Sequence, residues 1–157
     1  MRRLANSFLF EFHDAIATLP GATAARQLVV GRALEYLDKL SRQAAGDRPL
    51  QLELAQAYVK IGDVQGKPYT ANLGDAEGAI ASYTKATEIA LPLVDRETGS
   101  DVTDARRIVS SAFASVAAVE ARRISWRAQR NITCKRSPSR NVCSQMILRT
   151  RMSGAAC

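Results

Sequence analysis

Apolar side chains recur at intervals of three and four residues along most of the chain up to residue 123, and no stretch of useful length alternates apolar with polar residues. This spacing gathers apolar side chains on one face of an α-helix, whereas a half-buried strand needs a period of two. Pro20-Gly21, Gly46-Asp47 and Gly99-Ser100 interrupt the pattern with residues typical of turns. The sequence therefore predicts an all-α fold built from antiparallel helix hairpins.

The first three predicted helices follow from their apolar stripes and turn residues. They cover residues 4–19, 23–45 and 49–62, and Pro49 suits the first turn of the third. Gly62 is expected to end that third helix. The second helix is expected to face the core with Ala25, Leu28, Val29, Ala33, Leu37 and Leu40.

A loop is predicted over residues 63–73, and Tyr69 is its one residue of a type common in binding sites. A fourth helix begins near Asp75 and continues through Pro92 with a kink, because apolar residues follow the proline in register. A fifth helix, capped by Asp101 or Thr103, is expected to end near residue 123.

The third and fourth predicted helices also carry a pattern of residue sizes. Leu54-Ala55-x-x-Tyr58 sets a large, a small and an aromatic residue ahead of Gly62-Asp63, and Gly74-Asp75-x-x-x-Ala79-Ile80-x-x-Tyr83-x-x-Ala86 supplies a partner helix. This pattern resembles the tetratricopeptide repeat, a helix–turn–helix unit of about 34 residues. The resemblance implies a short stacked α-solenoid, clearest over residues 48–93, with an insertion at 62–73 and a degenerate echo at Val109-Ser110-x-x-Phe113. It also implies a repeat core made of Leu54, Ala55, Tyr58, Ala79, Tyr83 and Ala86.

In tetratricopeptide repeats the first helix of each pair lines a concave groove that holds a protein or peptide partner. By this resemblance Lys60 is expected to contact a partner carboxylate as a point charge. An exposed terminal helix face would also allow self-association. The groove-facing positions implied by the resemblance are Leu52, Gln56, Val59 and Lys60 in the clear repeat, and Arg107, Ser111, Ala114 and Ser115 in the degenerate one.

Four strings give a second, closer resemblance: LANSFLFEFHDAI at 4–16, RALEYL at 32–37, GDVQG at 62–66 and NLGD at 72–75. They resemble the region after the membrane span in bacterial serine/threonine protein kinases with tetratricopeptide repeats, over about residues 2–122. The kinase glycine-rich loop, lysine, H-R-D and D-F-G motifs do not occur in this chain. We therefore expect a sensor or scaffold portion with no catalytic residues and no cofactor. It would be membrane-tethered in the full-length family and cytoplasmic as the chain stands.

Residues 121–157 differ sharply from the rest, because they hold nine of the 22 Lys and Arg residues and none of the 15 acids. Cys134, Cys143 and Cys157 lie there at spacings that match no zinc site, so no metal is expected. The 124–157 segment is open to three interpretations: a basic disordered tail, an out-of-frame translation, or a nucleic-acid-binding arm. In the last, Trp126 would stack on a base while Arg127 and Arg130 contact phosphates.

The function predicted from the sequence is thus a non-catalytic protein–protein interaction module of tetratricopeptide type. Nucleic-acid or polyanion binding through the basic C-terminal tail is the less favoured alternative. Asp38 and the other acids on the predicted helices form no paired arrangement in the sequence and are assigned to the solvated surface. The longest uncharged run, residues 108–119, is too short for a membrane span.

Overall fold

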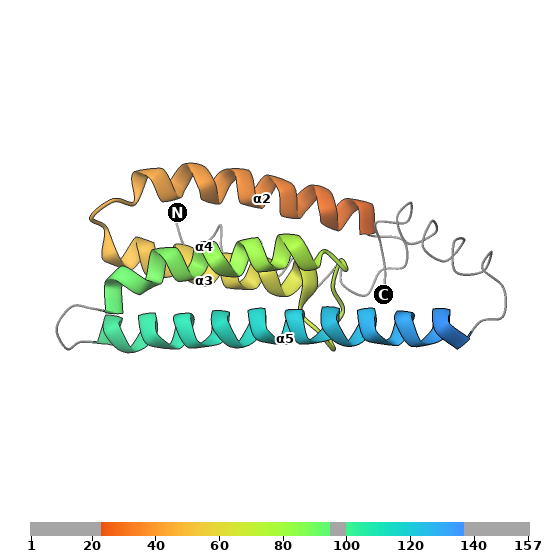
Figure 1. Cartoon of the computed structure of the whole chain (residues 1–157). Helices are drawn as coiled ribbons and strands as arrows, with labels where there is room; N and C mark the ends of the chain where they lie inside the picture. Colours follow the sequence, from red (N-terminus) through yellow and green to blue (C-terminus); the bar gives the residue numbers. More distant parts are fainter. Residues whose placement is uncertain (1–22, 95–99, 137–157) are drawn as a thin grey trace.

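Four α-helices make up the part of the chain that the computed structural model describes, residues 23–94 and 100–136. They are α2 (Thr23–Gln43), α3 (Arg48–Gly66), α4 (Ala76–Val94) and α5 (Ser100–Arg136), and these residues contain no strand (Figure 1). The prediction of an all-α fold is confirmed for this part of the chain. The first predicted helix, residues 4–19, lies outside the described residues.

Two aspartates fix where α3 and α4 begin. The Asp47 carboxylate accepts a hydrogen bond from the Leu50 backbone N–H at 3.1 Å, and Pro49 occupies the first turn of α3 as predicted. Asp75 plays the same part for α4, where its Oδ1 accepts the Gly78 N–H at 2.9 Å. Both carboxylates satisfy backbone donors that a helix leaves unpaired at its start.

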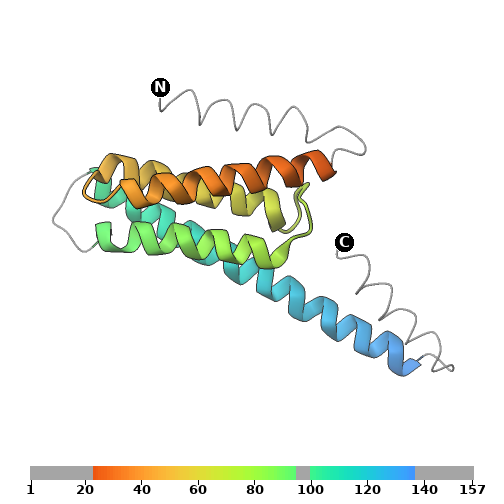
Figure 2. The ribbon, with the colours of Figure 1, turned by 90° about the horizontal axis from the view of Figure 1, so that it is seen from above.

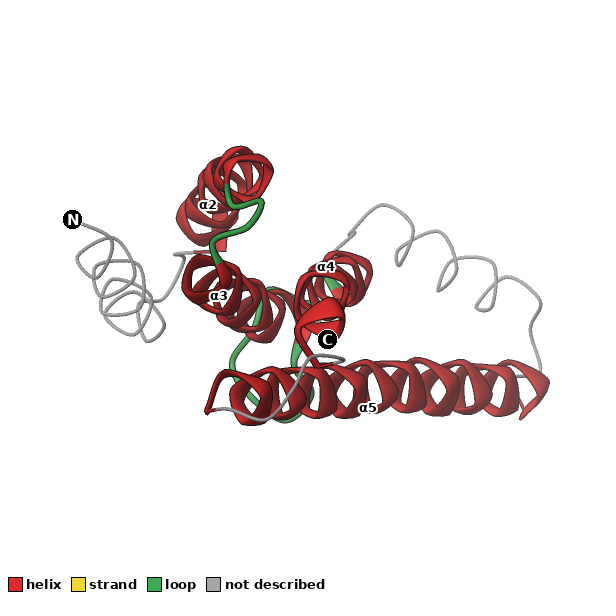
Figure 3. Cartoon of the chain, turned by 90° about the vertical axis from the view of Figure 1, so that its left-hand side faces the viewer, coloured by secondary structure: helices red, strands yellow, loops and turns green. Residues whose placement is uncertain are grey.

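The helices α3 and α4 form an antiparallel hairpin, and the other two helices lie on different sides of it. α5 crosses the hairpin obliquely and extends well beyond its end (Figure 2). α2 lies over α3, on the side away from α5 (Figure 3). α3 is therefore the central element, since it contacts all three other helices.

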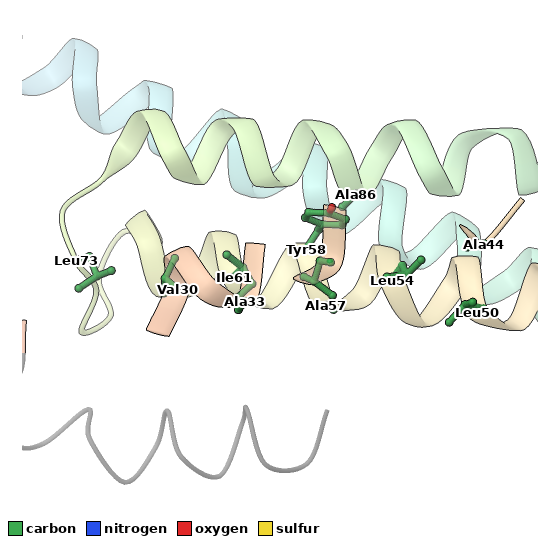
Figure 4. Close-up of a cluster of buried hydrophobic side chains, with 11 residues drawn as sticks. Val30, Ala33, Ala44, Leu50, Leu54, Ala57, Tyr58, Ile61, Leu73 and Ala86 are labelled. Carbon is green, nitrogen blue, oxygen red and sulfur yellow. The ribbon is translucent and has the colours of Figure 1, made fainter. Parts of the chain in front are cut away.

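Alanines at the helix contacts let the backbones approach closely. Ala55 on α3 and Ala105 on α5 are fully buried in one cluster, together with Leu93 of α4. A second cluster joins α2, α3 and α4, and Figure 4 shows Tyr58 reaching from α3 toward Ala86 of α4. Val59 packs against both of these clusters and against a third between α4 and α5, so the core is continuous.

The buried face of α2 differs from the predicted one. Its buried residues are Arg26, Val30, Ala33 and Leu37, while Leu28 is 65% exposed. Ala33 and Leu37 were thus predicted correctly, and Leu40 is half-buried against the core, but Ala25 and Leu28 are exposed and Val29 is only half-buried. The first turns of α2 carry apolar residues on more than one face, so spacing alone did not determine which face packs against α3.

The third predicted helix ends too early, because α3 continues through Gly62 to Gly66. Gly62 lies inside the helix, and a Cβ at this position would come within 2.7 Å of the Tyr83 ring. The glycine therefore serves close packing of α3 against α4 instead of making a turn. The connection to α4 is correspondingly shorter than the predicted insertion at 62–73, and it covers residues 67–75.

The last helix is longer than predicted at both ends. α5 begins at Ser100, ahead of the predicted caps Asp101 and Thr103, and it runs to Arg136. Residues 124–136 are thus helical, whereas a disordered tail was one of the three interpretations of the 124–157 segment, and residues 137–157 lie outside the described part. Phe113 is 58% exposed and Ala112 is buried, so the aromatic position of the predicted degenerate echo does not lie in the core. Among the described helices none has the length and apolar character to cross a membrane.

Candidate functional site

Two cavities of about 580 and 370 Å³ lie one after the other along α2, between it and the α3–α4 hairpin, and we call the two together the α2–α4 groove. Both are lined by the same face of α2, since the contributing residues follow one another at helical spacing. In Figure 3, α2 lies above α3 and to one side of α4. On α2 the residues that line this α2–α4 groove are Gln27, Val30, Gly31, Leu34, Asp38, Ser41 and Arg42.

The smaller cavity is built around Asp38, which links three helices. Its Oδ1 accepts a hydrogen bond from the Tyr58 hydroxyl of α3 at 2.5 Å and another from Lys85 Nζ of α4 at 2.6 Å. Lys85 Nζ also lies 5.5 Å from the centre of the Tyr58 ring, within the range of a cation–π contact. Arg42 and Glu88 complete the charged lining.

The hydrogen bonds favour the ionised form of the Asp38 carboxyl. Lys85 first, and Tyr58 second, lower the pKa of the Asp38 carboxyl by stabilising its charged form. Burial, and then the hydrogen bond to Asp38, raise the pKa of the Tyr58 phenol. The cluster is consequently a fixed arrangement of charges, suited to ionic recognition, in which the proton of Tyr58 stays in place.

The larger cavity lies at the other end of the groove, beside the loop that connects α3 to α4. Gln65 is 4% exposed, and its Oε1 accepts a hydrogen bond from the Ser82 hydroxyl at 2.5 Å. Arg123 reaches this end from α5, and its guanidinium lies 3.1 Å from Glu120 and 3.5 Å from Glu77. The cavity thus offers amide, carboxylate and guanidinium groups within one space.

A second tyrosine–aspartate pair repeats the arrangement of the first. The Tyr83 hydroxyl of α4 donates to Asp63 Oδ1 of α3 at 2.8 Å, and Lys67 Nζ lies 3.0 Å from the other carboxylate oxygen. In both pairs a buried phenol on one helix donates to an aspartate on the helix before it. Burial first, and the bond to Asp63 second, raise the pKa of Tyr83.

The structure separates the predicted core residues from the predicted binding residues. Leu54, Ala55, Tyr58, Ala79, Tyr83 and Ala86 are all buried.

The positions predicted to face a partner differ in their exposure in the structure. Leu52 is buried against α4 and α5, and Val59 is half-buried and packs against the core. Gln56, Lys60, Arg107, Ser111 and Ala114 are exposed and Ser115 is half-buried, and Arg107 lies 3.0 Å from Asp104. None of these positions lines either of the two cavities.

The charged residues of the groove were not predicted from the sequence, in which Asp38 was assigned to the solvated surface. The available signal was Tyr58, because a buried phenol normally finds a hydrogen-bond partner. Within residues 23–94 and 100–136, no three His, Cys, Asp or Glu residues are grouped so as to hold a metal ion. A scan of protein-family models finds no match to the chain, and searches of curated proteins and of solved structures find none either.

Proposed function

We propose that the chain is a non-catalytic protein–protein interaction module that binds an extended segment of a partner protein in the α2–α4 groove. The observation that carries the proposal is the alignment of two cavities along one face of α2. From Gln27 to Arg42 the groove follows about 15 residues of helix, or roughly 22 Å. This length suits about six or seven residues of extended peptide.

The polar groups of the groove indicate what such a segment contains. The side chains of Asp38 and Lys85 are 41% and 42% exposed, so both retain surface for a partner although they contact each other. Arg42 and Glu88 add a charge of each sign at the same cavity. A segment with both acidic and basic side chains is therefore the expected ligand.

We further propose that the module is of tetratricopeptide type and forms the sensor or scaffold portion of a serine/threonine kinase-like protein. Support for the repeat comes from the order of α3, α4 and α5, in which a helix hairpin is followed by a third helix packed on it through small residues. Support for the kinase association comes from the four strings described above, two of which, RALEYL and GDVQG, fall on α2 and α3.

Site-specific photocrosslinking tests the proposal and also decides between the two candidate surfaces. Peptides that bind the full chain would first be selected from a random library. A photocrosslinking residue would then replace either Ser41, in the α2–α4 groove, or Gln56, on the surface of α3 where the sequence predicted the partner to bind. We expect crosslinks from position 41 only.

The double substitution D38K/K85D tests the role of the charges in the groove, because it keeps an ion pair between α2 and α4 but exchanges the positions of its two charges. It should reduce the affinity of the selected peptides without unfolding the chain. Crosslinks from position 56 alone would assign binding to the α3 surface, and a failure to select any peptide would argue against an interaction module.

A further inference from the structure

A line of aromatic and guanidinium groups runs along α5, away from the α2–α4 groove. Arg122, Trp126 and Arg130 follow at intervals of four residues and therefore share one side of the helix. The Arg130 guanidinium carbon lies 3.9 Å from the centre of the Trp126 ring, and that of Arg122 lies 5.5 Å from the ring of Tyr69. We call these four residues, Tyr69, Arg122, Trp126 and Arg130, the aromatic–arginine surface.

Tyr69 is held in this position by the loop between α3 and α4. Its φ is +63°, in the left-handed region that side chains with a Cβ rarely adopt, and it is 91% exposed. The Asn72 side-chain amide holds the loop by donating to the carbonyls of Lys67 at 2.6 Å and of Thr70 at 2.9 Å. The loop thus presents an aromatic ring to solvent next to an arginine of another element.

Among the described residues, no carboxylate is paired with the arginines of this surface. Arg123 is paired with Glu120 and Glu77, whereas Arg122 and Arg130 of this surface, and Arg127 next to Trp126 in the sequence, make no ion pair within the described residues. No acid follows Glu120 in the chain. An anionic partner would therefore find guanidinium groups here that contact aromatic rings and are not paired with a described carboxylate.

From this juxtaposition we propose that the aromatic–arginine surface binds single-stranded nucleic acid. Guanidinium groups contact phosphates, while exposed aromatic rings and arginine planes stack on unpaired bases, whatever their sequence. A duplex hides its base faces, so it offers only the phosphate contribution. The rings would stack on one or two bases while Arg122, Arg127 and Arg130 follow the backbone.

The arrangement of apolar residues argues against a lipid surface as the partner. An interfacial helix collects its large apolar side chains on one face. Here Ile124, which is 65% exposed, lies two positions from Trp126 and therefore on nearly the opposite side of α5. The aromatic rings are thus surrounded by arginines and not by an apolar stripe.

Trp126 is the only tryptophan in the chain, so its fluorescence reports directly on this surface. A thymidine oligonucleotide titrated into the full chain should quench the emission, whereas inorganic polyphosphate, which has no bases, should not. W126A should weaken oligonucleotide binding, measured by anisotropy, on the order of 5- to 100-fold. R122Q should lower the slope of log affinity against log salt by about 0.7.

Two matched controls remove similar groups from other places on the same molecule. F113A deletes an exposed aromatic ring of α5, and R106Q deletes an exposed arginine that is 16 positions from Arg122, or about 24 Å along the helix. Both should bind the oligonucleotide nearly as the unmodified chain does. Circular dichroism establishes that each variant keeps its helix content.

Three results would overturn the proposal. The first is W126A binding the oligonucleotide as well as the unmodified chain does. The second is equal affinity for polyphosphate and oligonucleotide, which would show unspecific attraction by a basic chain. The third is a blue shift of Trp126 emission on phosphatidylserine vesicles without quenching by the oligonucleotide, which would assign the surface to membranes. The proposal does not depend on the function of the α2–α4 groove.

Discussion

Replacing Gly62 with alanine would place a methyl group against the ring of Tyr83 in the middle of the α3–α4 contact. The added Cβ would lie 2.7 Å from one ring carbon and 2.9 Å from two others, where ordinary contacts begin near 3.4 Å. Tyr83 is fully buried, and its hydroxyl is bonded to Asp63. The ring therefore cannot move away without disturbing the packing or losing that bond.

The expected magnitude combines two opposing effects. Adding a methyl group to a packed core costs about 1–3 kcal/mol. Alanine is also a better helix former than glycine by about 0.8–1 kcal/mol, which offsets part of that cost. Gly31 is the matched control, because it lies inside α2 with nothing within 4 Å of its added Cβ. G31A should gain the helix contribution without the overpacking.

The helix contribution cancels in the difference between the two variants, which therefore isolates the overpacking at Gly62. We expect G62A to be less stable than G31A by about 1–3 kcal/mol. Urea denaturation followed by circular dichroism measures this as a difference in midpoint of about 1 M for a typical dependence on denaturant. A G62A chain as stable as G31A would refute the close approach of α3 and α4 at this point.

Further predictions concern the core and the two tyrosine–aspartate pairs. A55L should overpack the fully buried contact of α3 with α4 and α5 and cost about 1–3 kcal/mol, and an unchanged melting temperature would contradict the assigned packing. Because the pKa of Asp38 is lowered on folding, its contribution to stability is present above its ordinary pKa of 3.8 and is lost as the pH falls below it. The stability difference between the unmodified chain and D38N, from urea denaturation, should therefore narrow in acid. The pKa of Tyr83 is raised from 10, so its contribution is lost as the pH rises above 10. Y83F should accordingly lower the pH dependence of stability in that range by about 1.4 kcal/mol per pH unit, and an unchanged slope would argue against the buried phenol.

The sequence allowed the helical class and the centre of the core to be predicted, for a physical reason. Leu54, Ala55 and Tyr58 lie at the contact of α3 with several helices, so their sizes are constrained from more than one side. The same holds for Ala79 and Tyr83 on α4. Where several neighbours constrain one residue, the pattern of sizes is informative in the sequence alone.

Prediction was poorer where a helix packs against the other described helices on one side only. On α2, Leu28 and Val30 are both apolar, and only the position of α3 decides which of them is buried. On α5, Ala112 and Phe113 present the same ambiguity, and the larger residue proved to be the exposed one. Periodicity defines a helix face to within about one residue, whereas burial depends on the crossing of two helices.

The polar part of the candidate site depends on contacts that are distant in sequence. Asp38 and Lys85 are 47 positions apart, and nothing in the local sequence links them. Tyr69 and Arg122 meet only because the α3–α4 loop lies beside α5. Such pairs are set by tertiary packing, and a single sequence carries no periodic signal for them.

The length of α5 has a consequence for its own order. At 37 residues it is about 55 Å long, whereas the 19 residues of α3 or α4 span about 28 Å. Beyond Arg123, which reaches back to Glu77, α5 leaves the other helices (Figure 2). A separate helix of the length of residues 124–136 would be only marginally stable in water, because starting a helix is costly. Here the half of α5 that packs against the hairpin acts as the helix nucleus, so each further turn only has to be added to an existing helix. The helical order of α5 should therefore decline gradually toward Arg136. A ligand bound to Trp126 and Arg130 would stabilise the last turns of α5. Binding at this surface should therefore slow the amide hydrogen exchange of those turns.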